Sequence, residues 1–376
     1  MIEGPQIAQN APEHPAGKPN WRHVGAFLGL TFGLTWLLDL LIYLHGGLGT
    51  PGSTSVVQLQ MLFPAFSAIV LQVFFFPESP LYRKRPAGRE QWFYSAFLLL
   101  TVISALAIVG TYLSPAQGKA RLIAASIPQA LAFAALLLLI VLRRVAGREA
   151  MSRVGLSWGN RRDWLLFAPG IVAFYVLQVV LNALFGLGPV HPSLMAVLPP
   201  RISPAPFVIL IGAYSVLVTP ILALVIAFGE EYGWRGYLQS EMLKMGRVRG
   251  VLLVGAIWGA WHWPLILMGF SYPGYPLFGL FLTVLFTIGF AVVLGTAVLR
   301  SGSILLAAYL HALNDQTTGF IVFLGYKPFN PAFSFGVGIY GIATLALITL
   351  LILRAPVWRG RGSSLISPSS GADQRE

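Results

Sequence analysis

Two adjacent carboxylates and an arginine lie at the end of a long apolar run of the chain. Glu230 and Glu231 follow the apolar segment 207–229, and Arg235 comes four positions after Glu231. Positions four apart share one face of a helix, so we expect Glu231 and Arg235 to form an ion pair. Glu230 is rotated by about 100° from Glu231 and is expected to face a cavity, where its carboxylate could act as a general base on water.

A histidine in a later apolar segment follows a tryptophan by four positions. Residues 258–264 read WGAWHWP, so Trp258 and His262 share a helix face. Pro264 interrupts regular helical hydrogen bonding just beyond them. Gly255 and Gly259 carry no side chain and should let a neighbouring helix or a substrate come close.

A second histidine lies in another apolar segment, in the stretch His311-Ala312-Leu313-Asn314-Asp315. His311 and Asp315 are four positions apart and share a face, with Asn314 beside them. A lone histidine or a single Glu/Arg pair is more often structural than catalytic. Ionisable groups in membrane spans, however, usually have a function. We therefore expect Glu230, His262 and His311 to converge from three helices on one hydrated pocket.

The composition predicts the class of protein that carries these motifs. Of the 376 residues, 56% are hydrophobic and only 10% are charged, with a mean hydropathy of +0.74, whereas soluble domains are about one-quarter charged. The apolar runs are continuous rather than alternating, which favours membrane-spanning helices over strands. The fold class expected is all-α, a polytopic transmembrane helix bundle of about ten spans.

The ten expected spans also predict an orientation. With the N-terminus inside, 20 of the 25 lysines and arginines fall in inside segments and 4 in outside segments, Arg235 being the remaining one. This bias predicts that both termini are cytoplasmic. The spans are 23–45, 55–77, 92–113, 122–142, 164–186, 207–229, 251–270, 276–299, 303–324 and 335–354.

The chain is expected to fold as one membrane unit between two polar tails. The net charge of +12 lies mostly in short loops, which indicates contact with anionic lipid rather than with nucleic acid. The absence of cysteine excludes disulfides and thiol chemistry. The organisation predicted is a disordered tail 1–20, N-terminal transmembrane helices 21–204, a core 205–320, a C-terminal transmembrane helix 321–355 and a disordered tail 356–376.

The first expected span has two further features. Gly25, Gly29 and Gly33 form a small-residue face, on which another helix is expected to pack closely. Asp39 is a lone acid near the outer boundary of the same span. We assign it no chemistry.

The three motifs together resemble the CPBP family of intramembrane proteases. Glu-Glu-x-x-x-Arg at 230–235, aromatic-x-x-x-His at 258–262 and His-x-x-x-Asn/Asp at 311–315 occur in the family's order, over residues 205–320. The family includes CAAX prenyl endopeptidases and bacterial relatives of the lysostaphin-resistance type, also described as the Abi domain. Trp258 stands where the family usually has phenylalanine, and Asp315 where many members have asparagine.

The resemblance implies a division of roles within the site. An ionised Asp315 could not donate to an oxyanion, so it is protonated, or it orients His311, or Asn314 supplies the donor. The roles implied are water activation by Glu230, its ion-paired support by Glu231 and Arg235, the holding of water or a metal by His262, and oxyanion stabilisation or completion of the site by His311 with Asp315 or Asn314.

The requirement for a metal stays open at the level of sequence. Glu230, His262 and His311 could form a three-ligand zinc site with an open position for water. They could equally act without metal, as a glutamate base with histidine support. No His-Glu-x-x-His motif occurs in the chain.

These features favour a membrane endopeptidase, metallo- or glutamate-dependent, that is a multi-pass protein of the cell (plasma) membrane. Its expected partners are the lipid bilayer and a membrane-anchored protein or peptide substrate, CAAX-like in the sense of the family. A transporter or ion-coupled membrane protein could use the same buried Glu and His residues. A non-proteolytic immunity or scaffold protein could retain the motifs and act only by binding.

Overall fold

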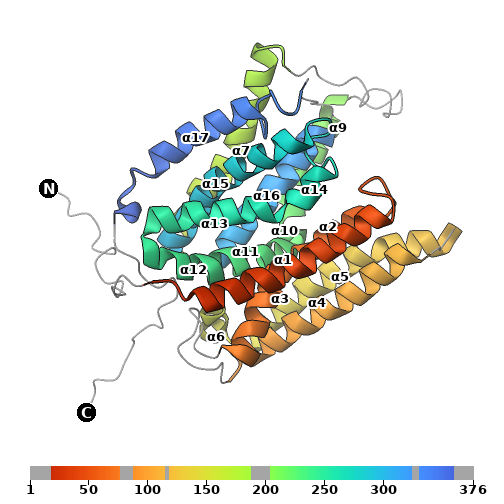
Figure 1. Ribbon diagram of the computed structural model, residues 1–376, viewed down its shortest axis with the longest axis vertical. Coiled ribbons are helices and arrows are strands. Elements are labelled where there is room, and N and C mark those ends of the chain that lie inside the picture. Colours follow the sequence, from red (N-terminus) through yellow and green to blue (C-terminus); the bar gives the residue numbers. More distant parts are fainter. Residues whose placement is uncertain (1–17, 77–87, 115–117, 188–203, 324–329, 360–376) are drawn as a thin grey trace.

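The computed structural model describes residues 18–76, 88–114, 118–187, 204–323 and 330–359, which form helices and no strand (Figure 1). The first half comprises α1 (Trp21–Leu44), α2 (Ser53–Gln60), α3 (Phe63–Val70), the π-helix η2 (Leu71–Phe75), α4 (Glu90–Leu113), α5 (Gly118–Val145), α6 (Arg148–Arg153) and α7 (Arg161–Leu184). The second half comprises α9 (Pro204–Leu217), α10 (Thr219–Leu222), α11 (Leu224–Glu231), the π-helix η3 (Tyr232–Leu238), α12 (Gln239–Met242), η4 (Leu243–Met245), α13 (Arg247–Trp261), α14 (Trp263–Leu267), α15 (Pro276–Ser301), α16 (Ile304–Phe323), α17 (Ile339–Ile352) and η5 (Pro356–Trp358).

Five of the described helices are long and apolar enough to cross a membrane: α1, the continuous stretch Ser53–Phe75, α4, α7 and α15. A sixth is added if Ile209–Leu222 and Leu224–Met245, which are bent by 57° relative to each other, are one broken span. The all-helical membrane fold is therefore confirmed, while the count of ten spans and the cytoplasmic placement of both ends stay predictions. Two expected spans are shorter than predicted: 251–270 divides into α13 and α14 at His262, and α17 has 14 residues.

The two predicted tails lie mostly outside the described residues, but their described edges are ordered. The backbone N–H of Asn20 donates to Glu241 Oε2 at 2.8 Å, and the Asn20 side chain caps α1 by accepting from the His23 N–H. At the other end, Trp358 is buried within η5. These described edges dock on the helices, and the division of the chain at residues 20 and 356 stays a prediction.

The helix that carries the two adjacent glutamates lies inside the bundle. α11 packs against α3 on one side and against α16 on the other, while α13 packs along α15. Glycines permit the closest approaches, because a Cβ on Gly233 would lie 2.4 Å from Pro64 Cβ, and one on Gly259 would lie 2.6 Å from Val284 Cα of α15. The close packing expected at Gly255 and Gly259 is thus confirmed, and the neighbour is α15.

The small-residue face of α1 behaves differently. A Cβ at Gly25, Gly29 or Gly33 would meet nothing within 4 Å, and all three are exposed. No described part of the chain packs on this face, so the expectation that another helix of the chain lies there is wrong. The opposite face of α1, which includes Phe27, Thr31 and Thr35, is the buried one.

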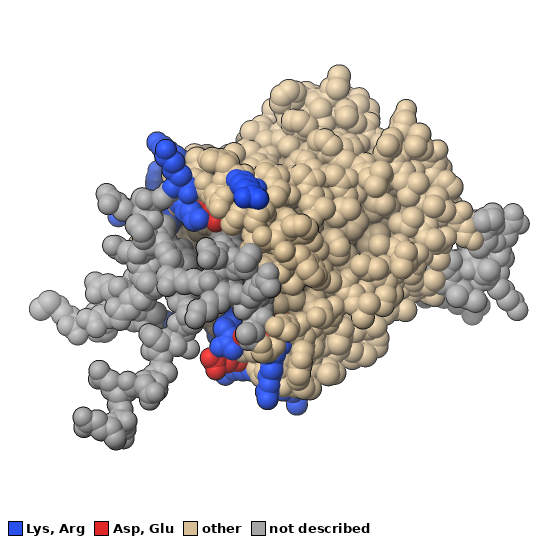
Figure 2. All heavy atoms as spheres, turned by 60° about the horizontal axis from the view of Figure 1, so that its bottom comes forward, with Lys and Arg blue, Asp and Glu red and all other residues tan. Residues whose placement is uncertain are grey.

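Among the described residues seen in Figure 2, charged side chains gather at one end of the bundle, and the remaining described surface in this view carries none. α1 begins and α17 ends at that same end (Figure 1). Ion pairs such as Lys244–Glu241 at 2.7 Å and Arg300–Asp163 at 2.8 Å are made there. This arrangement agrees with the bias that led us to place both termini on one side of the membrane.

The topology can be tested with single cysteines, since the chain contains none of its own. Trp21 and Leu44 are exposed at opposite ends of α1, and Arg354 is exposed just after α17. In sealed vesicles of known orientation, an impermeant maleimide should label Trp21→Cys and Arg354→Cys from the same side and Leu44→Cys from the other. Labelling of Trp21→Cys and Arg354→Cys from opposite sides would contradict the placement of the two ends.

Packing against α3 predicts a strong effect at Gly233. Gly233→Ala places a methyl group against the backbone of Pro64, which lies as close as 2.6 Å to the added Cβ, and overpacking of this kind costs about 1–3 kcal/mol. Thermal unfolding in detergent should show a lowered Tm. The matched control is Gly110→Ala in α4, where the added Cβ meets nothing within 4 Å. Equal Tm values for the two variants would refute the close approach.

Candidate active site

The Glu-Glu-x-x-x-Arg motif lies where an α-helix changes into a π-helix. α11 ends at Glu231, and Tyr232–Leu238 continue as η3, so that the Gln239 N–H donates to the carbonyl of Trp234 five residues back. Every residue of η3 is buried. π-Helical turns are rare and occur mostly at functional sites, and here the wider turn carries the arginine of the motif.

The buried ion pair expected from the spacing is present. Arg235 Nε lies 3.1 Å from Glu231 Oε2, and both side chains are 0% exposed. Arg235 Nη1 also donates to Glu231 Oε1 at 3.3 Å. The guanidinium lies 4.3 Å from the ring centroid of Trp258, a cation–π contact that is stronger away from water. The arginine is therefore held between a carboxylate and an aromatic face.

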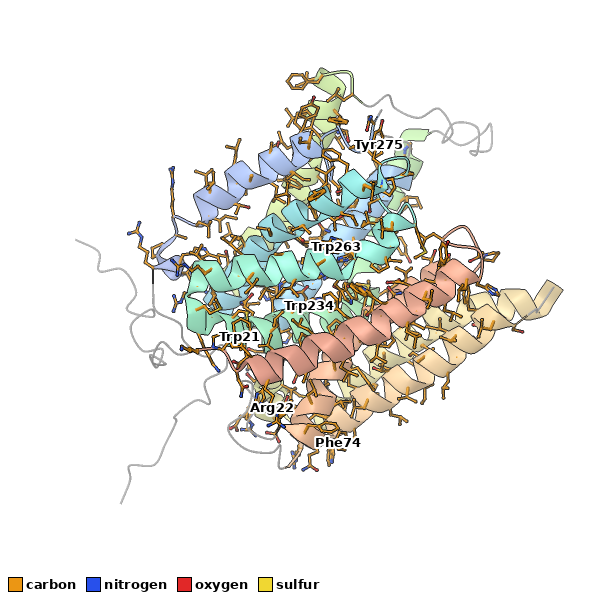
Figure 3. The ribbon with its side chains drawn as sticks, viewed as in Figure 1. Trp21, Arg22, Phe74, Trp234, Trp263 and Tyr275 are labelled. Carbon is orange, nitrogen blue, oxygen red and sulfur yellow. The ribbon has the colours of Figure 1, made fainter. Side chains whose placement is uncertain are left out.

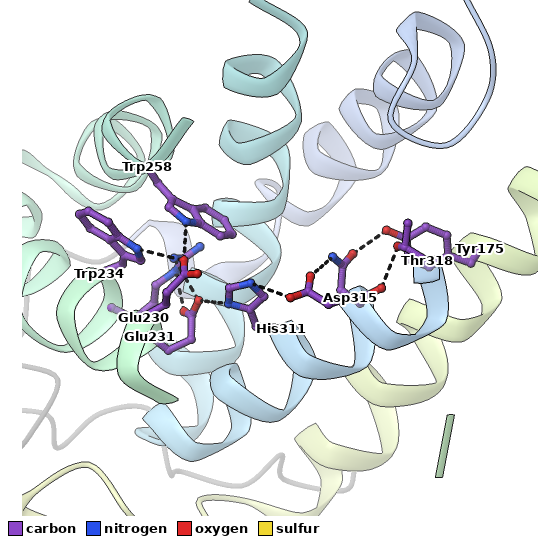
Figure 4. A network of polar contacts seen from close by, with 10 residues as sticks. Tyr175, Glu230, Glu231, Trp234, Trp258, His311, Asp315 and Thr318 are labelled. Atoms are coloured by element: carbon purple, nitrogen blue, oxygen red, sulfur yellow. Dashed lines mark hydrogen bonds and ion pairs between the residues drawn. The ribbon is translucent and has the colours of Figure 1, made fainter. Parts of the chain in front are cut away.

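Glu230 is held by two tryptophans. Its Oε2 accepts from Trp258 Nε1 at 2.8 Å and from Trp234 Nε1 at 3.3 Å (Figure 4). The side chain is buried, with 2% of the residue exposed. Glu230 forms none of the ion pairs found among the described residues, and the expectation that it faces a cavity finds no support there, since its side chain is enclosed by protein. Because the Glu230 side chain is shielded from bulk water, the two indole N–H groups supply the hydrogen-bond donors that water would otherwise give.

His311 lies between two carboxylates. Its Nδ1 is 2.8 Å from Glu231 Oε1, and because a carboxylate only accepts, Nδ1 is the donor. Its Nε2 is 3.5 Å from Asp315 Oδ2. The ring meets Trp258 edge-on at 5.3 Å between centroids. Figure 4 shows the chain of contacts that runs from Glu231 through His311 to Asp315.

The side-chain amide of Asn314, three positions after His311, is hydrogen-bonded to a helix far away in the sequence. Asn314 Nδ2 donates to Asp315 Oδ1 at 3.1 Å, and Asn314 Oδ1 accepts from the Tyr175 hydroxyl at 2.7 Å. Tyr175 belongs to α7 and is buried. Asn314 and Asp315 are thus fixed relative to each other, and α7 is joined to the network.

His262 lies on the break between α13 and α14. Its Nδ1 lies 2.9 Å from the carbonyl oxygen of Trp258 and must donate to it, since a carbonyl only accepts. In the neutral ring this leaves Nε2 as an acceptor. The ring lies 5.9 Å from Trp258 and 4.8 Å from Trp261, centroid to centroid.

Trp258 is the residue around which the predicted groups meet. Its Nε1 donates to Glu230, its face carries Arg235, and the rings of His262 and His311 lie within 5.9 Å of its own. Glu230, His262 and His311 are therefore neighbours of one indole. No hydrogen bond joins either imidazole to Glu230 among the described residues.

The side chains do not fit a metal centre as they lie. Among the described residues, no three His, Cys, Asp or Glu side chains are grouped closely enough to hold a metal ion. Glu230 directs Oε2 at two indole donors, and His262 directs Nδ1 at a backbone carbonyl. A zinc site built from Glu230, His262 and His311 therefore finds no support in this geometry.

Two members of the site were not singled out from the sequence. Trp234, labelled in Figure 3, lies four positions after Glu230, and this spacing alone could have indicated it. Tyr175 is 139 positions away from Asn314 in sequence. Nothing in its local sequence marks it, since only the packing of α7 on α16 brings the two together.

A cavity of about 710 Å³ lies between α1 and α14, and Pro264, two positions after His262, is among its walls. Trp36, Leu40, Leu267 and Met268 line it together with Asp39. Asp39 is buried and accepts from Gln60 Nε2 at 2.6 Å, so this acid is held by a neighbouring helix. The cavity is largely apolar and opens beside the segment that carries His262.

Fold and site together define a helical membrane protein with a buried cluster of acids, histidines and an arginine. Comparison with known families agrees with the motifs. The profile of the family described as Rce1-like, type II CAAX prenyl endopeptidase Rce1-like, matches residues 212–317, a little over a quarter of the chain. The match agrees with the resemblance of the three motifs to the CPBP/CAAX protease family, and it supports an intramembrane CAAX-type endopeptidase in general.

The match covers the helices that carry all three motifs and leaves out α1 to α7. No curated protein matches the chain. No solved structure matches it either.

The buried pair predicts a large effect of removing one partner. Arg235→Met leaves Glu231 buried without its guanidinium, which should lower the free energy of unfolding by about 3–5 kcal/mol. The double variant Glu231→Gln/Arg235→Met removes both charges and should recover part of this loss. Thermal or denaturant unfolding in detergent measures both.

The matched control is Glu149→Gln, which removes a charge from an exposed pair with Arg153 and should change stability by less than about 1 kcal/mol. A single Arg235→Met variant as stable as this control would contradict the description of a buried, mutually dependent pair.

Proposed function

We propose that the chain is an intramembrane endopeptidase that hydrolyses a peptide bond in a membrane-anchored, CAAX-like substrate. The observation that carries the proposal is Glu230: a buried carboxylate whose Oε2 is fixed by two indole N–H groups. Among the described residues, no hydrogen bond reaches its Oε1. A fixed carboxylate with one uncommitted oxygen is the group that a general base acting on water requires.

The reaction proposed is hydrolysis with Glu230 as the proton carrier. Glu230 Oε1 takes a proton from water as the water oxygen bonds to the carbonyl carbon of the scissile peptide. The same proton then passes to the amide nitrogen as the carbon–nitrogen bond breaks, so that an acid and an amine leave. To Nε2 of His262, the acceptor nitrogen of that ring, we assign the second hydrogen of the water.

The remaining residues are assigned supporting roles. Glu231 and Arg235 keep the helix turn and the Trp258 ring in place through the buried pair and the cation–π contact. We assign two donors to the developing oxyanion, Nε2–H of a protonated His311 and the Asn314 side-chain amide, with Asp315 fixing both groups. Asp315 contacts both His311 and Asn314, which favours an orienting role for this carboxylate over a donor role.

The apolar cavity between α1 and α14 supports a substrate with a hydrophobic anchor. Its volume of about 710 Å³ is within the range of ligand pockets, and its walls include Leu40, Leu267 and Met268. We propose that the anchor of the substrate, a lipid or an apolar peptide segment, lies here while the peptide bond reaches the site beside His262.

Replacement of the base tests the proposed function. Glu230→Gln keeps the shape of the side chain and should lower peptide hydrolysis by about 10²–10⁴-fold, the usual contribution of a general base. The assay uses purified protein in proteoliposomes with farnesylated and unmodified CAAX-type peptides, and mass spectrometry of the products. Glu149→Gln, an exposed acid of α6, is the matched control and should cleave like the wild type.

The same preparations separate the proposal from its rivals. Wild-type protein that moves protons or solutes across the vesicle membrane and cleaves no peptide would favour the transporter. A Glu230→Gln variant that is folded, as judged by Tm, and cleaves as fast as wild type would refute the role of Glu230. Comparison of protein termini in membranes carrying either form would identify natural substrates.

A further inference from the structure

The first helix lies outside the segment that matches the protease family, yet it packs on the site. α1 spans Trp21–Leu44, whereas the match begins at residue 212. Phe27 of α1 meets the Trp234 ring edge-on at 5.7 Å and lies 4.9 Å from the Tyr237 ring. Its buried face therefore covers η3, the π-helix of the Glu-Glu-x-x-x-Arg motif.

Further along α1, two side chains make a reciprocal pair of hydrogen bonds with Trp261. Trp261 Nε1 donates to Thr35 Oγ1 at 2.9 Å, and Trp36 Nε1 donates to the backbone oxygen of Trp261 at 3.1 Å. Thr35 is 1% and Trp261 3% exposed, so the first bond is shielded from water. The ring and the backbone of Trp261 are thus both held by adjacent residues of one helix. We call this pair of bonds the Thr35/Trp36 clamp.

The clamp contacts Trp261, the last residue before the helix break at His262. α13 ends at Trp261, and α14 begins at Trp263 with Pro264 in its first turn. Pro264 has no N–H, so the hydrogen-bond ladder is interrupted next to His262. A break in the ladder leaves the direction of the following residues less determined by local structure. An external anchor at Trp261 restores that constraint.

Trp261 also contacts two groups of the proposed site. Its ring lies 4.8 Å from the His262 ring and 5.8 Å from the Trp234 ring. Trp234 in turn donates to Glu230 Oε2. A shift of the Trp261 ring would therefore displace the imidazole on one side and a donor to the base on the other.

We propose that Thr35 and Trp36 are positioning residues of the endopeptidase, which act through Trp261 to hold His262 and Trp234 in their working geometry. The inference rests on the proposed function and adds to it a part of the chain that carries no catalytic motif. Small displacements of groups around a reacting centre lower the rate steeply, even when binding and folding are intact.

Conservative substitutions test the clamp. Thr35→Val keeps the shape and removes the acceptor, and Trp36→Phe keeps an aromatic ring and removes the N–H. Each should lower kcat about 5- to 20-fold. KM should change by less than about 3-fold in Thr35→Val, whereas KM of Trp36→Phe also reports on the proposed anchor cavity, which Trp36 lines. Thr35→Ser keeps the hydroxyl and should restore most of the rate. The matched control is Trp21→Phe at the exposed start of α1, which should leave kcat unchanged.

A double-mutant cycle shows whether the clamp acts through His262. In a His262→Ala background, Thr35→Val should cause little further loss of kcat, because the group that it positions is already gone. A full additional loss in that background would overturn the inference. So would a loss of rate in Thr35→Val that is matched by a loss of folded protein and is not restored by Thr35→Ser.

A chemical readout separates failure of the clamp from failure of the proposed function. Diethylpyrocarbonate modifies imidazole nitrogens, and peptide mass spectrometry reports its rate at His262 separately from the other five histidines of the chain. Thr35→Val and Trp36→Phe should change the rate at His262 by about 3-fold or more, and leave the rate at His23, near the start of α1, unchanged. An unchanged rate at His262 in both variants would refute the clamp, even if wild type proves to be no protease.

Discussion

A charge buried in an apolar bundle must be paired with an opposite charge, and this constraint organises the structure around Arg235. Glu231 takes two nitrogens of its guanidinium, and the face of Trp258 covers it. Both charged side chains are 0% exposed. If one of them is removed, water cannot solvate the charge of the other. The ring that covers the arginine also donates to Glu230. The ion pair and the proposed catalytic acid therefore depend on one tryptophan.

Placing such a pair inside the bundle requires unusual backbone and close neighbours. The α-helix that ends at Glu231 continues as a π-helix, which turns more widely and carries Arg235. Gly233 brings this segment against the backbone of α3, and Gly229 brings it against Met61 and Leu62 just before α3; at both glycines even one methyl group would collide. On the opposite side, His311 of α16 takes the remaining contact with Glu231. The site is thus enclosed by α3, α13 and α16, and not by a loop.

The enclosure reaches beyond the segment that resembles the family. Tyr175 of α7 holds Asn314, and Thr35 and Trp36 of α1 hold Trp261. Both helices lie outside residues 212–317. A proposed division of labour follows, in which the matched segment carries the reacting groups and the N-terminal helices hold them rigidly. Enzymes need both, because a reacting group is only as well placed as the side chains around it.

Composition and spacing alone determined the helical membrane class, the Glu231–Arg235 pair and the grouping of acid and histidines, because helical periodicity decides which side chains share a face. The partners of Glu230, the path of α1 along Trp261 and the bond from Tyr175 were decided only by the tertiary structure. The tertiary structure also decided that no described residue packs on Gly25, Gly29 and Gly33, although their spacing predicted a neighbouring helix there. Periodicity specifies one helix face at a time, whereas the identity of the group opposite that face depends on how distant segments pack.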